Sequence, residues 1–228
     1  MYKLYIANKN YSSWSMRGWL CAKLSRAPFE EILAPFKSSG SNPAFREFAP
    51  NGLVPCLHDG DIVVWDSLAI AEYLAERHAG MWPADAKTRA FARSACAEMH
   101  AGFRTLRNEM TMCIRERVDV RPWSSGLETD IARVASLWSE GRRRFASSGE
   151  YLCGDFSIAD AFFAPVAFRF QTYGVALDGA AGQYGRRLLA HPLVREWEDE
   201  ALAETAIVEA DEPRHVYRDK LRASSAST

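Results

Sequence analysis

Apolar and polar positions alternate in steps of two over residues 2–7, which predicts a strand near the centre of a sheet. Residues 18–24 follow helical spacing after a serine-rich start at 12–17, because serines are natural helix caps. Residues 29–36 predict a second strand, which Pro35 restricts to a sheet edge. Together with the segments up to residue 78, the order strand–helix–strand–helix–strand–strand–helix indicates an α/β unit.

The segment 50–78 carries the strongest local signals. Val54-Pro55 predicts a strand start, and a proline in such a turn is a candidate for a cis peptide bond. Asp59-Gly60 is a favoured hairpin turn before a β-branched run. Asp66 or Ser67 then caps a helix whose apolar positions are Leu68, Ile70, Ala71 and Leu74. A proline-led strand beside a helix N-terminus presents backbone groups and a positive dipole to a small anionic ligand.

The residues after 84 have helical spacing throughout, and 80–84 are typical of a linker between domains. Residues 85–118 predict one long helix with a stripe of Met99, Phe103, Leu106 and Met110. A second helix is expected over 128–145. Ser157 and Asp160 form an aspartate variant of a capping box that opens a third helix, with Pro165 expected to kink it. Both capping residues are assigned a structural role. The polar end after Pro213 is expected to lie loosely on the surface.

Composition restricts the class of protein further. The chain has 228 residues, 48% of them hydrophobic and 25% charged, and a net charge of −1. These values are typical of a soluble globular protein and predict neither a nucleic-acid partner nor a membrane partner. The N-terminus lacks the layout of a signal peptide. Five cysteines without metal-ligand spacing predict no metal site and buried free thiols in a reducing cytoplasm.

The run Ser12-Ser13-Trp14-Ser15-Met16-Arg17 is the main candidate for chemistry. A hydroxyl at a helix N-terminus stabilises a nearby thiolate by donating a hydrogen bond to it. A serine is too weak an acid to serve as the base, so its role is that of a donor. Ser13 is slightly favoured over Ser12, and both stay open, whereas Ser15 is expected to cap the helix and Arg17 to form a structural ion pair.

These motifs, in this order, resemble the glutathione S-transferase family, and the serine run is most similar to its zeta class. The resemblance implies a thioredoxin-like glutathione-binding domain over 1–79 and an all-helical domain over 85–228. It implies that Ser13 or Ser12 holds the sulfur of glutathione. It also implies that the backbone of Val54, before Pro55, pairs with the peptide part of glutathione, and that Asp66 and Ser67 hold its γ-glutamyl end.

Three positions depart from the family pattern. Asp66 stands where Glu or Gln is usual, Trp14 stands where the zeta class carries Cys, and Leu53 stands where Lys is common. Lys37 is therefore a candidate to replace that lysine toward a ligand carboxylate. The resemblance further implies a homodimer and a second-substrate pocket, for which Tyr11, Phe103, Arg107 and Glu98 are candidates.

The function expected from the resemblance is transfer of the glutathione thiolate to a small electrophile, with glutathione as co-substrate and without a metal. Two alternatives stay open. One is a glutathione-dependent isomerase of the maleylacetoacetate type, and the other is a non-catalytic glutathione-binding or interaction protein. Disulfide exchange through a protein thiol is disfavoured, because no cysteine stands at the start of the first helix.

Overall fold

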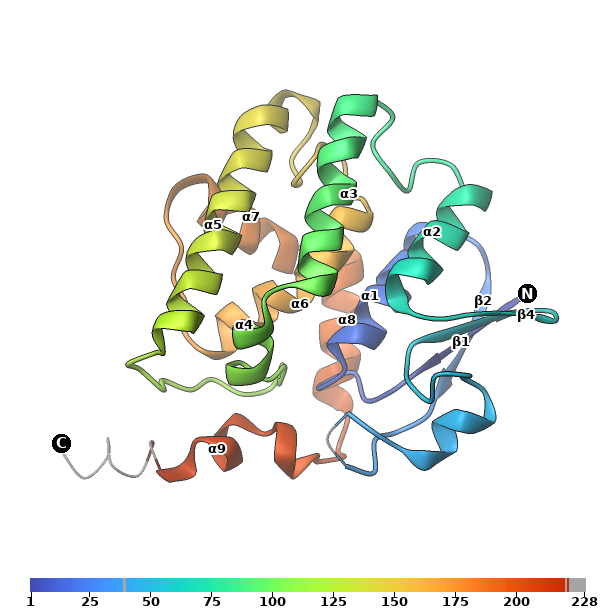
Figure 1. The fold of residues 1–228 in the computed structure, drawn as a ribbon, viewed down its shortest axis with the longest axis horizontal. Helices are drawn as coiled ribbons and strands as arrows, with labels where there is room; N and C mark the ends of the chain where they lie inside the picture. The colour runs from blue at the N-terminus through green and yellow to red at the C-terminus, as the bar shows by residue number, and fades with distance from the viewer. Residues whose placement is uncertain (39, 220, 222–228) are drawn as a thin grey trace.

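The fold was analysed in a computed structural model, which describes residues 1–38, 40–219 and 221 (Figure 1). A small sheet with two helices lies beside a larger group of helices. The elements are β1 (Tyr2–Ile6), α1 (Ser13–Leu24), β2 (Phe29–Leu33), the 3₁₀ helix η1 (Pro43–Glu47), β3 (Cys56–Asp59), β4 (Ile62–Val64), α2 (Ser67–Arg77), α3 (Ala86–Ala101), α4 (Arg104–Glu109), α5 (Ser125–Phe145), η2 (Ala146–Ser148), α6 (Ile158–Thr172), α7 (Gly179–Leu189), α8 (Pro192–Ala203), η3 (Glu209–Asp211) and α9 (Pro213–Val216).

The sheet has the order β2-β1-β3-β4, so β1 is central as predicted. β1 runs parallel to β2 and antiparallel to β3, with Leu4 opposite Leu57. The hairpin turn lies one residue later than expected, because Asp59 pairs with Ile62 and Gly60 takes the positive φ of +63°. The predicted second strand ends at Leu33, before Pro35. This mixed sheet with the helical domain confirms the predicted thioredoxin-like plus all-α fold class.

Both helices of the α/β part begin at residues that the sequence singles out. Ser12 is the N-cap of α1, and its side chain accepts from the backbone N–H of Ser15 at 3.2 Å. Asp66 is the N-cap of α2, and its Oδ1 accepts from the N–H of Leu68 at 3.0 Å. These caps satisfy donors that would otherwise lack partners, and they leave both N-termini at the same edge of the domain.

The helical domain is built around α6, whose residues from Ile158 to Phe170 are all buried (Figure 1). The capping box at its start is present, since Asp160 accepts from the N–H of Ser157 at 2.9 Å. Asp160 also accepts from the Leu152 N–H at 3.0 Å and the Tyr184 hydroxyl at 2.8 Å. Pro165 lies inside α6, and the helix continues past it to Thr172. The proline therefore does not end the helix.

The long helix predicted over 85–118 is wrong. It divides into α3 and α4 at Gly102 and Phe103. A Cβ at Gly102 would lie 2.7 Å from the carbonyl oxygen of Glu98, so only glycine fits this helix end. Phe103 then takes a left-handed conformation with φ of 54°, and the chain turns before Arg104. The apolar stripe of this region lies in the core as expected, but the break divides it between α3 and the segment around α4.

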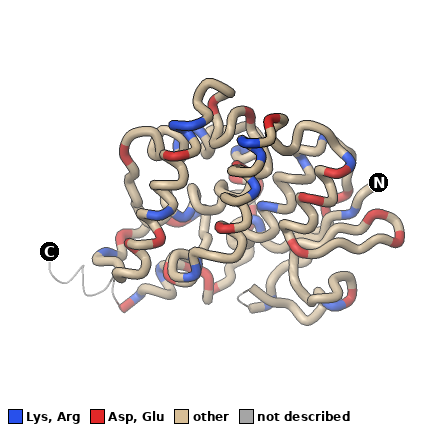
Figure 2. Tube along the Cα trace, turned by 45° about the horizontal axis from the view of Figure 1, so that its top comes forward, with Lys and Arg blue, Asp and Glu red and all other residues tan. Residues whose placement is uncertain are grey.

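The two domains share one continuous hydrophobic core, in which α1 contacts both α6 and α8. Basic and acidic positions are mixed along the whole trace in the view of Figure 2. In the part of the chain that the structure describes, no helix combines the length and the apolar character needed to cross a membrane. After Pro213 the described chain forms the short α9, and the predicted loose end from 222 onward lies outside the described residues.

Candidate active site

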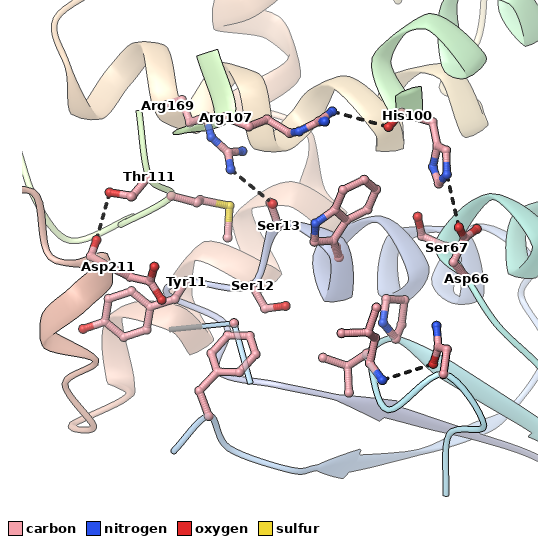
Figure 3. Close-up of a pocket in the computed structure, with 18 residues that line it drawn as sticks. Tyr11, Ser12, Ser13, Asp66, Ser67, His100, Arg107, Thr111, Arg169 and Asp211 are labelled. Carbon is pink, nitrogen blue, oxygen red and sulfur yellow. Dashed lines mark hydrogen bonds and ion pairs between the residues drawn. The ribbon is translucent and has the colours of Figure 1, made fainter. Parts of the chain in front are cut away.

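A cavity of about 360 Å³ opens where the start of α1, the Val54-Pro55 turn and the start of α2 face the helical domain (Figure 3). The α/β side contributes all six residues predicted for the sulfur, the peptide part and the γ-glutamyl end of glutathione, namely Ser12, Ser13, Val54, Pro55, Asp66 and Ser67. The helical side contributes three basic side chains, namely His100, Arg107 and Arg169. The structure thus brings together residues as far apart in the chain as Ser12 and Arg169.

The two candidate serines have different hydrogen bonds. The Ser12 hydroxyl donates to Ser15 Oγ at 2.8 Å and accepts from the Ser15 N–H, so both of its functions serve the helix cap. Ser15 is not the cap that the sequence suggested; its Oγ accepts from the Ala7 N–H at 3.0 Å. Ser13 Oγ accepts from Arg169 Nη2 at 3.2 Å, which leaves its own proton available to a ligand in the cavity.

Arg169 is a site residue that the sequence analysis missed. Its Nε donates to the carbonyl oxygen of Met110 at 2.6 Å, and its Nη1 lies 3.4 Å from that of Pro165. Burial lowers the pKa of Arg169 to about 10, so the guanidinium stays cationic near neutral pH. Figure 3 shows it directed from α6 at the Ser13 hydroxyl. A fixed cation on the Ser13 oxygen makes that hydroxyl a better donor.

The proline turn has the predicted geometry. The Val54–Pro55 peptide bond is cis, and β3 begins at the next residue, Cys56. Gly18 of α1 faces this turn so closely that an added Cβ would lie 2.8 Å from the Pro55 ring. The absence of a side chain at Gly18 therefore lets the proline edge approach α1 and sets one wall of the cavity.

Asp66 and Ser67 lie at the N-terminus of α2 (Figure 3) and line the same cavity as the Val54–Pro55 turn. Asp66 Oδ2 lies 3.1 Å from His100 Nε2, and this hydrogen bond is the main cause that lowers the pKa of the Asp66 carboxyl. Ser67 is fully buried, and its Oγ has no hydrogen-bond partner among the described residues. A buried polar atom on a cavity wall is matched to a polar ligand, because it costs free energy when unpaired.

Two of the three basic residues of the helical side, His100 and Arg107, lie on either side of the break between α3 and α4. Arg107 Nη1 donates to the carbonyl oxygens of Met99, His100 and Gly102, which surround the C-terminal end of α3. The Trp14 ring contacts His100 edge-on, with centroids 5.3 Å apart, and Arg107 lies 5.6 Å from the centre of the same ring. Trp14 therefore connects the start of α1 to the helical domain.

The C-terminal segment forms another wall. Thr111 Oγ1 donates to the backbone oxygen of Asp211 at 2.9 Å, and the Tyr11 hydroxyl donates to Glu212. Tyr11, Thr111 and Asp211 all line the cavity. Burial and the neighbouring Glu212 carboxylate raise the pKa of Tyr11. The Tyr11 hydroxyl is thus already engaged, so its ring is the part left to contact a substrate.

Three predicted residues are not among those that line the cavity. Lys37 lies exposed on the loop after β2, and its backbone N–H donates to the Ser41 carbonyl oxygen at 3.0 Å. Phe103 is 7% exposed and packs in the core, because its left-handed conformation turns it inward. Glu98 pairs with Arg133 at 2.6 Å. The roles assigned to Lys37, Phe103 and Glu98 therefore have no support in this cavity.

Arg17 does not form the expected ion pair. Its guanidinium is fully buried 4.5 Å from the Trp14 ring centre and 5.2 Å from that of Phe162. None of its three side-chain nitrogens has a hydrogen-bond partner in the described part of the chain. Burial lowers the pKa of Arg17 to about 9. Arg17 packs against the aromatic rings instead, and stands behind the cavity wall that Trp14 forms.

The five cysteines are free and buried, as predicted. Burial raises the pKa of Cys56 to about 11 and that of Cys153 to about 12, and it raises the pKa of the other three thiols as well. Because the thiolate is the reactive form, these groups are poor nucleophiles near neutral pH. Position 14 at the start of α1, where an exchange cysteine would be expected, holds Trp14.

The sequence contained a weak signal for Arg169 and little for His100. Arg169 is the one basic residue in an otherwise apolar, buried helix, and such a charge is costly unless it has a specific partner. His100 stands at the end of an amphipathic helix, where a solvated histidine is equally compatible with the pattern. Only the tertiary fold places its ring against Asp66.

Comparisons with known proteins agree with this geometry. Residues 11–77 match the model of the glutathione S-transferase N-terminal domain, and residues 115–200 match that of the C-terminal domain. A glutathione S-transferase 1 of Dianthus caryophyllus is 30% identical over 168 residues, which are 72% of this chain and 74% of that protein. A stringent starvation protein A homolog of Haemophilus ducreyi is 24% identical over 193 residues, or 82% and 84% of the two chains.

A solved structure with bound glutathione, described as a glutathione transferase homolog from Burkholderia, has the same fold. The match covers 89% of this chain and 98% of that one, with a TM-score of 0.66 and 24% identity. The fold, the site at the junction of the two domains, and the sequence matches define one class of protein. The chain belongs to the glutathione S-transferase family.

Proposed function

We propose that the chain is a glutathione transferase in which Ser13 holds the sulfur of glutathione while the thiolate attacks a small electrophile. The observation that carries this proposal is the hydrogen bond from Arg169 to Ser13 Oγ, at 3.2 Å. In this hydrogen bond the Ser13 oxygen is the acceptor, so the hydroxyl proton is free to be donated to the sulfur of glutathione. Ser12, by contrast, uses its proton within the helix cap.

The chemistry needs only the thiolate and the electrophile. A free thiol has a pKa of about 8.5, and the deprotonated sulfur is the nucleophile. A hydrogen bond to a charged group contributes roughly 1.5–3 kcal/mol. That free energy corresponds to a decrease of about one to two units in the thiol pKa. The thiol proton leaves to solvent, a carbon–sulfur bond forms, and the leaving group departs with its bonding electron pair.

The remaining subsites fit the tripeptide. Val54, before the cis Pro55, offers backbone groups to the peptide part of glutathione, and Ser67 offers an unpaired buried hydroxyl to the γ-glutamyl carboxylate at the N-terminus of α2. Asp66 offers a negative charge to the ammonium group. Arg107, Tyr11 and Thr111 then line the part of the cavity that is left for the electrophile. Holding both reactants in one cavity contributes to the rate by proximity.

We also propose that the protein is a cytoplasmic homodimer, as the family resemblance implies. The isomerase and the non-catalytic binding protein are the alternative functions, and no contact in the site favours either over transfer. Sedimentation velocity measures the oligomeric state directly.

The test compares Ser13→Ala with Ser12→Ala as a matched control. Binding of glutathione is measured by calorimetry, turnover by conjugation of a chlorinated nitrobenzene, and the thiol pKa of bound glutathione by thiolate absorbance against pH. We expect Ser13→Ala to raise this pKa by at least about one unit, because the donor to the sulfur is lost. Ser12→Ala should change it less and should instead lower stability by roughly 1 kcal/mol as a lost cap.

Three outcomes would contradict the proposal in different ways. If both variants titrate like the parent, the assigned role of the hydroxyl is wrong. Binding without conjugation over a broad panel of electrophiles would favour the non-catalytic alternative. Isomerisation of a cis double bond, with glutathione recovered unchanged, would favour the isomerase.

A further inference from the structure

Both carboxylate oxygens of Asp66 are engaged by the protein itself. Oδ1 accepts from the N–H groups of Leu68 at 3.0 Å and Ala69 at 3.4 Å, as an N-cap does. Oδ2 lies 3.1 Å from Nε2 of His100. Because a carboxylate only accepts, Nε2 carries the proton in this contact. These contacts hold the carboxylate plane at both ends, and Oδ2 keeps a further lone pair for a ligand.

The imidazole of His100 is held as firmly as the carboxylate. His100 stands in the last turn of α3, and its backbone oxygen accepts from Arg107 at 3.3 Å. The Trp14 ring lies edge-on to the imidazole at 5.3 Å, and the side chain is 23% exposed. Its Nδ1 is buried without a hydrogen-bond partner among the described residues. Among the described residues, the polar contact of the ring is therefore the one with Asp66.

Asp66 is shorter than the Glu or Gln that is usual at its position in the family, so its reach toward a ligand depends more strongly on its orientation. On one side, the hydrogen bonds from the backbone of α2 to Oδ1 limit rotation of the carboxylate. The hydrogen bond from His100 limits it on the other side, and Figure 3 shows both residues at the same end of the cavity. His100 therefore determines where the second oxygen of Asp66 points.

We propose that His100 is a positioning residue for glutathione, and that it orients the Asp66 carboxylate toward the γ-glutamyl ammonium group. This inference rests on the function proposed above. His100 belongs to the helical domain, whereas Asp66 belongs to the α/β domain. Recognition of the amino end of glutathione is thus shared between the two domains within one chain.

The experiment uses two ligands that differ by one group: glutathione, and glutaryl-cysteinyl-glycine, which lacks the amine. Dissociation constants are measured by calorimetry for the parent, His100→Phe and His100→Gln. Phenylalanine keeps a ring against Trp14 but has no donor. We expect His100→Phe to weaken glutathione binding by about tenfold while the amine-free ligand changes by less than about twofold. Glutamine retains an N–H donor, so His100→Gln should stay within about threefold of the parent for glutathione.

His78→Phe is the matched control, because His78 Nε2 makes a comparable contact with the Tyr2 hydroxyl at 3.0 Å, away from the cavity. It should leave both dissociation constants unchanged. The thiol pKa of bound glutathione should also be unchanged in His100→Phe, since Ser13 and Arg169 lie apart from His100 and Asp66 in the site.

Equal weakening of both ligands in His100→Phe, or no weakening of either, would overturn this inference and leave the proposed function standing. If the parent protein fails to bind glutathione at all, the proposed function and this inference fall together. A lower melting temperature in His100→Phe with the predicted difference between ligands would still support the positioning role, because a general loss of structure does not distinguish the amine.

Discussion

The starts of α2 and α6 both combine an aspartate with a serine, but one pair lines the cavity and the other is buried in the core. Asp66 at the start of α2 is about half exposed and lines the cavity. Asp160 at the start of α6 is fully buried and accepts from Leu152, Ser157 and Tyr184. An acidic residue at a helix start can therefore bind a ligand only where a free lone pair of its carboxylate faces a cavity.

The two carboxyl groups also differ in their acidity. The hydrogen bond from His100 lowers the pKa of Asp66, with smaller contributions from the N–H groups of α2. Burial raises the pKa of Asp160, against the opposing effect of its hydrogen-bond donors. The comparison shows that an aspartate and a serine at a helix start give a charge available to a ligand in one place and a buried structural junction in the other.

The largest effect is expected at the buried junction. Asp160→Ala leaves the N–H groups of Leu152 and Ser157 and the Tyr184 hydroxyl without their partner, and each buried unpaired group costs about 1–3 kcal/mol. We expect the free energy of unfolding in urea to fall by about 3–5 kcal/mol. A variant with parental stability and no activity would contradict the structural role and give Asp160 a place in catalysis.

An intermediate effect is expected at the cavity. Asp66→Ala should weaken glutathione binding by about tenfold in calorimetry, because the charge opposite the ligand ammonium is lost. Its stability should fall by only about 0.5–2 kcal/mol, as for a lost cap. Asp85→Ala is the matched control, since Asp85 caps α3 by accepting from Thr88 at 2.8 Å and does not line the cavity. Equal affinity of Asp66→Ala and the parent would remove Asp66 from the site.

The smallest effect concerns the pH dependence of stability. Because the folded-state pKa of Asp66 is lowered, the unfolded chain binds more protons in the acidic range, and stability due to this group rises with pH there. That contribution is present above the unfolded pKa and is lost as pH falls through the folded pKa. Asp66→Asn should therefore give a flatter stability curve than the parent between about pH 2 and 5. Parallel curves in urea titrations would show that the pair with His100 has no energetic consequence.

The sequence was sufficient for features that depend on neighbouring residues. The cap at Asp66, the cis bond before Pro55 and the capping box of Ser157 and Asp160 all follow from local rules, and the structure contains each of them. The α/β-then-helical order was likewise predictable from periodicity. The serine run placed a hydroxyl at the start of α1, although it left the choice between Ser12 and Ser13 open.

The rest of the site depends on contacts between distant segments. The preference for Ser13 requires Arg169, which is 156 residues away. The contact of Asp66 with His100 joins the start of α2 to the end of α3 in the helical domain. Phe103 was a candidate for the pocket because the family resemblance places this helix beside it, whereas the structure buries its side chain in the core. At Phe103 a single backbone turn changes which face of the chain meets the cavity.

The wall formed by η3 and the residues that follow it has a consequence for how the protein can diversify. This segment meets the remainder of the site through a few contacts, such as those of Asp211 with Thr111 and of Glu212 with Tyr11. The tripeptide side, in contrast, is embedded in two helix starts and a strand. Replacing the C-terminal segment would change the shape of the electrophile pocket and leave Ser13 unchanged. The range of electrophiles and the binding of the glutathione sulfur could therefore evolve in separate parts of the chain.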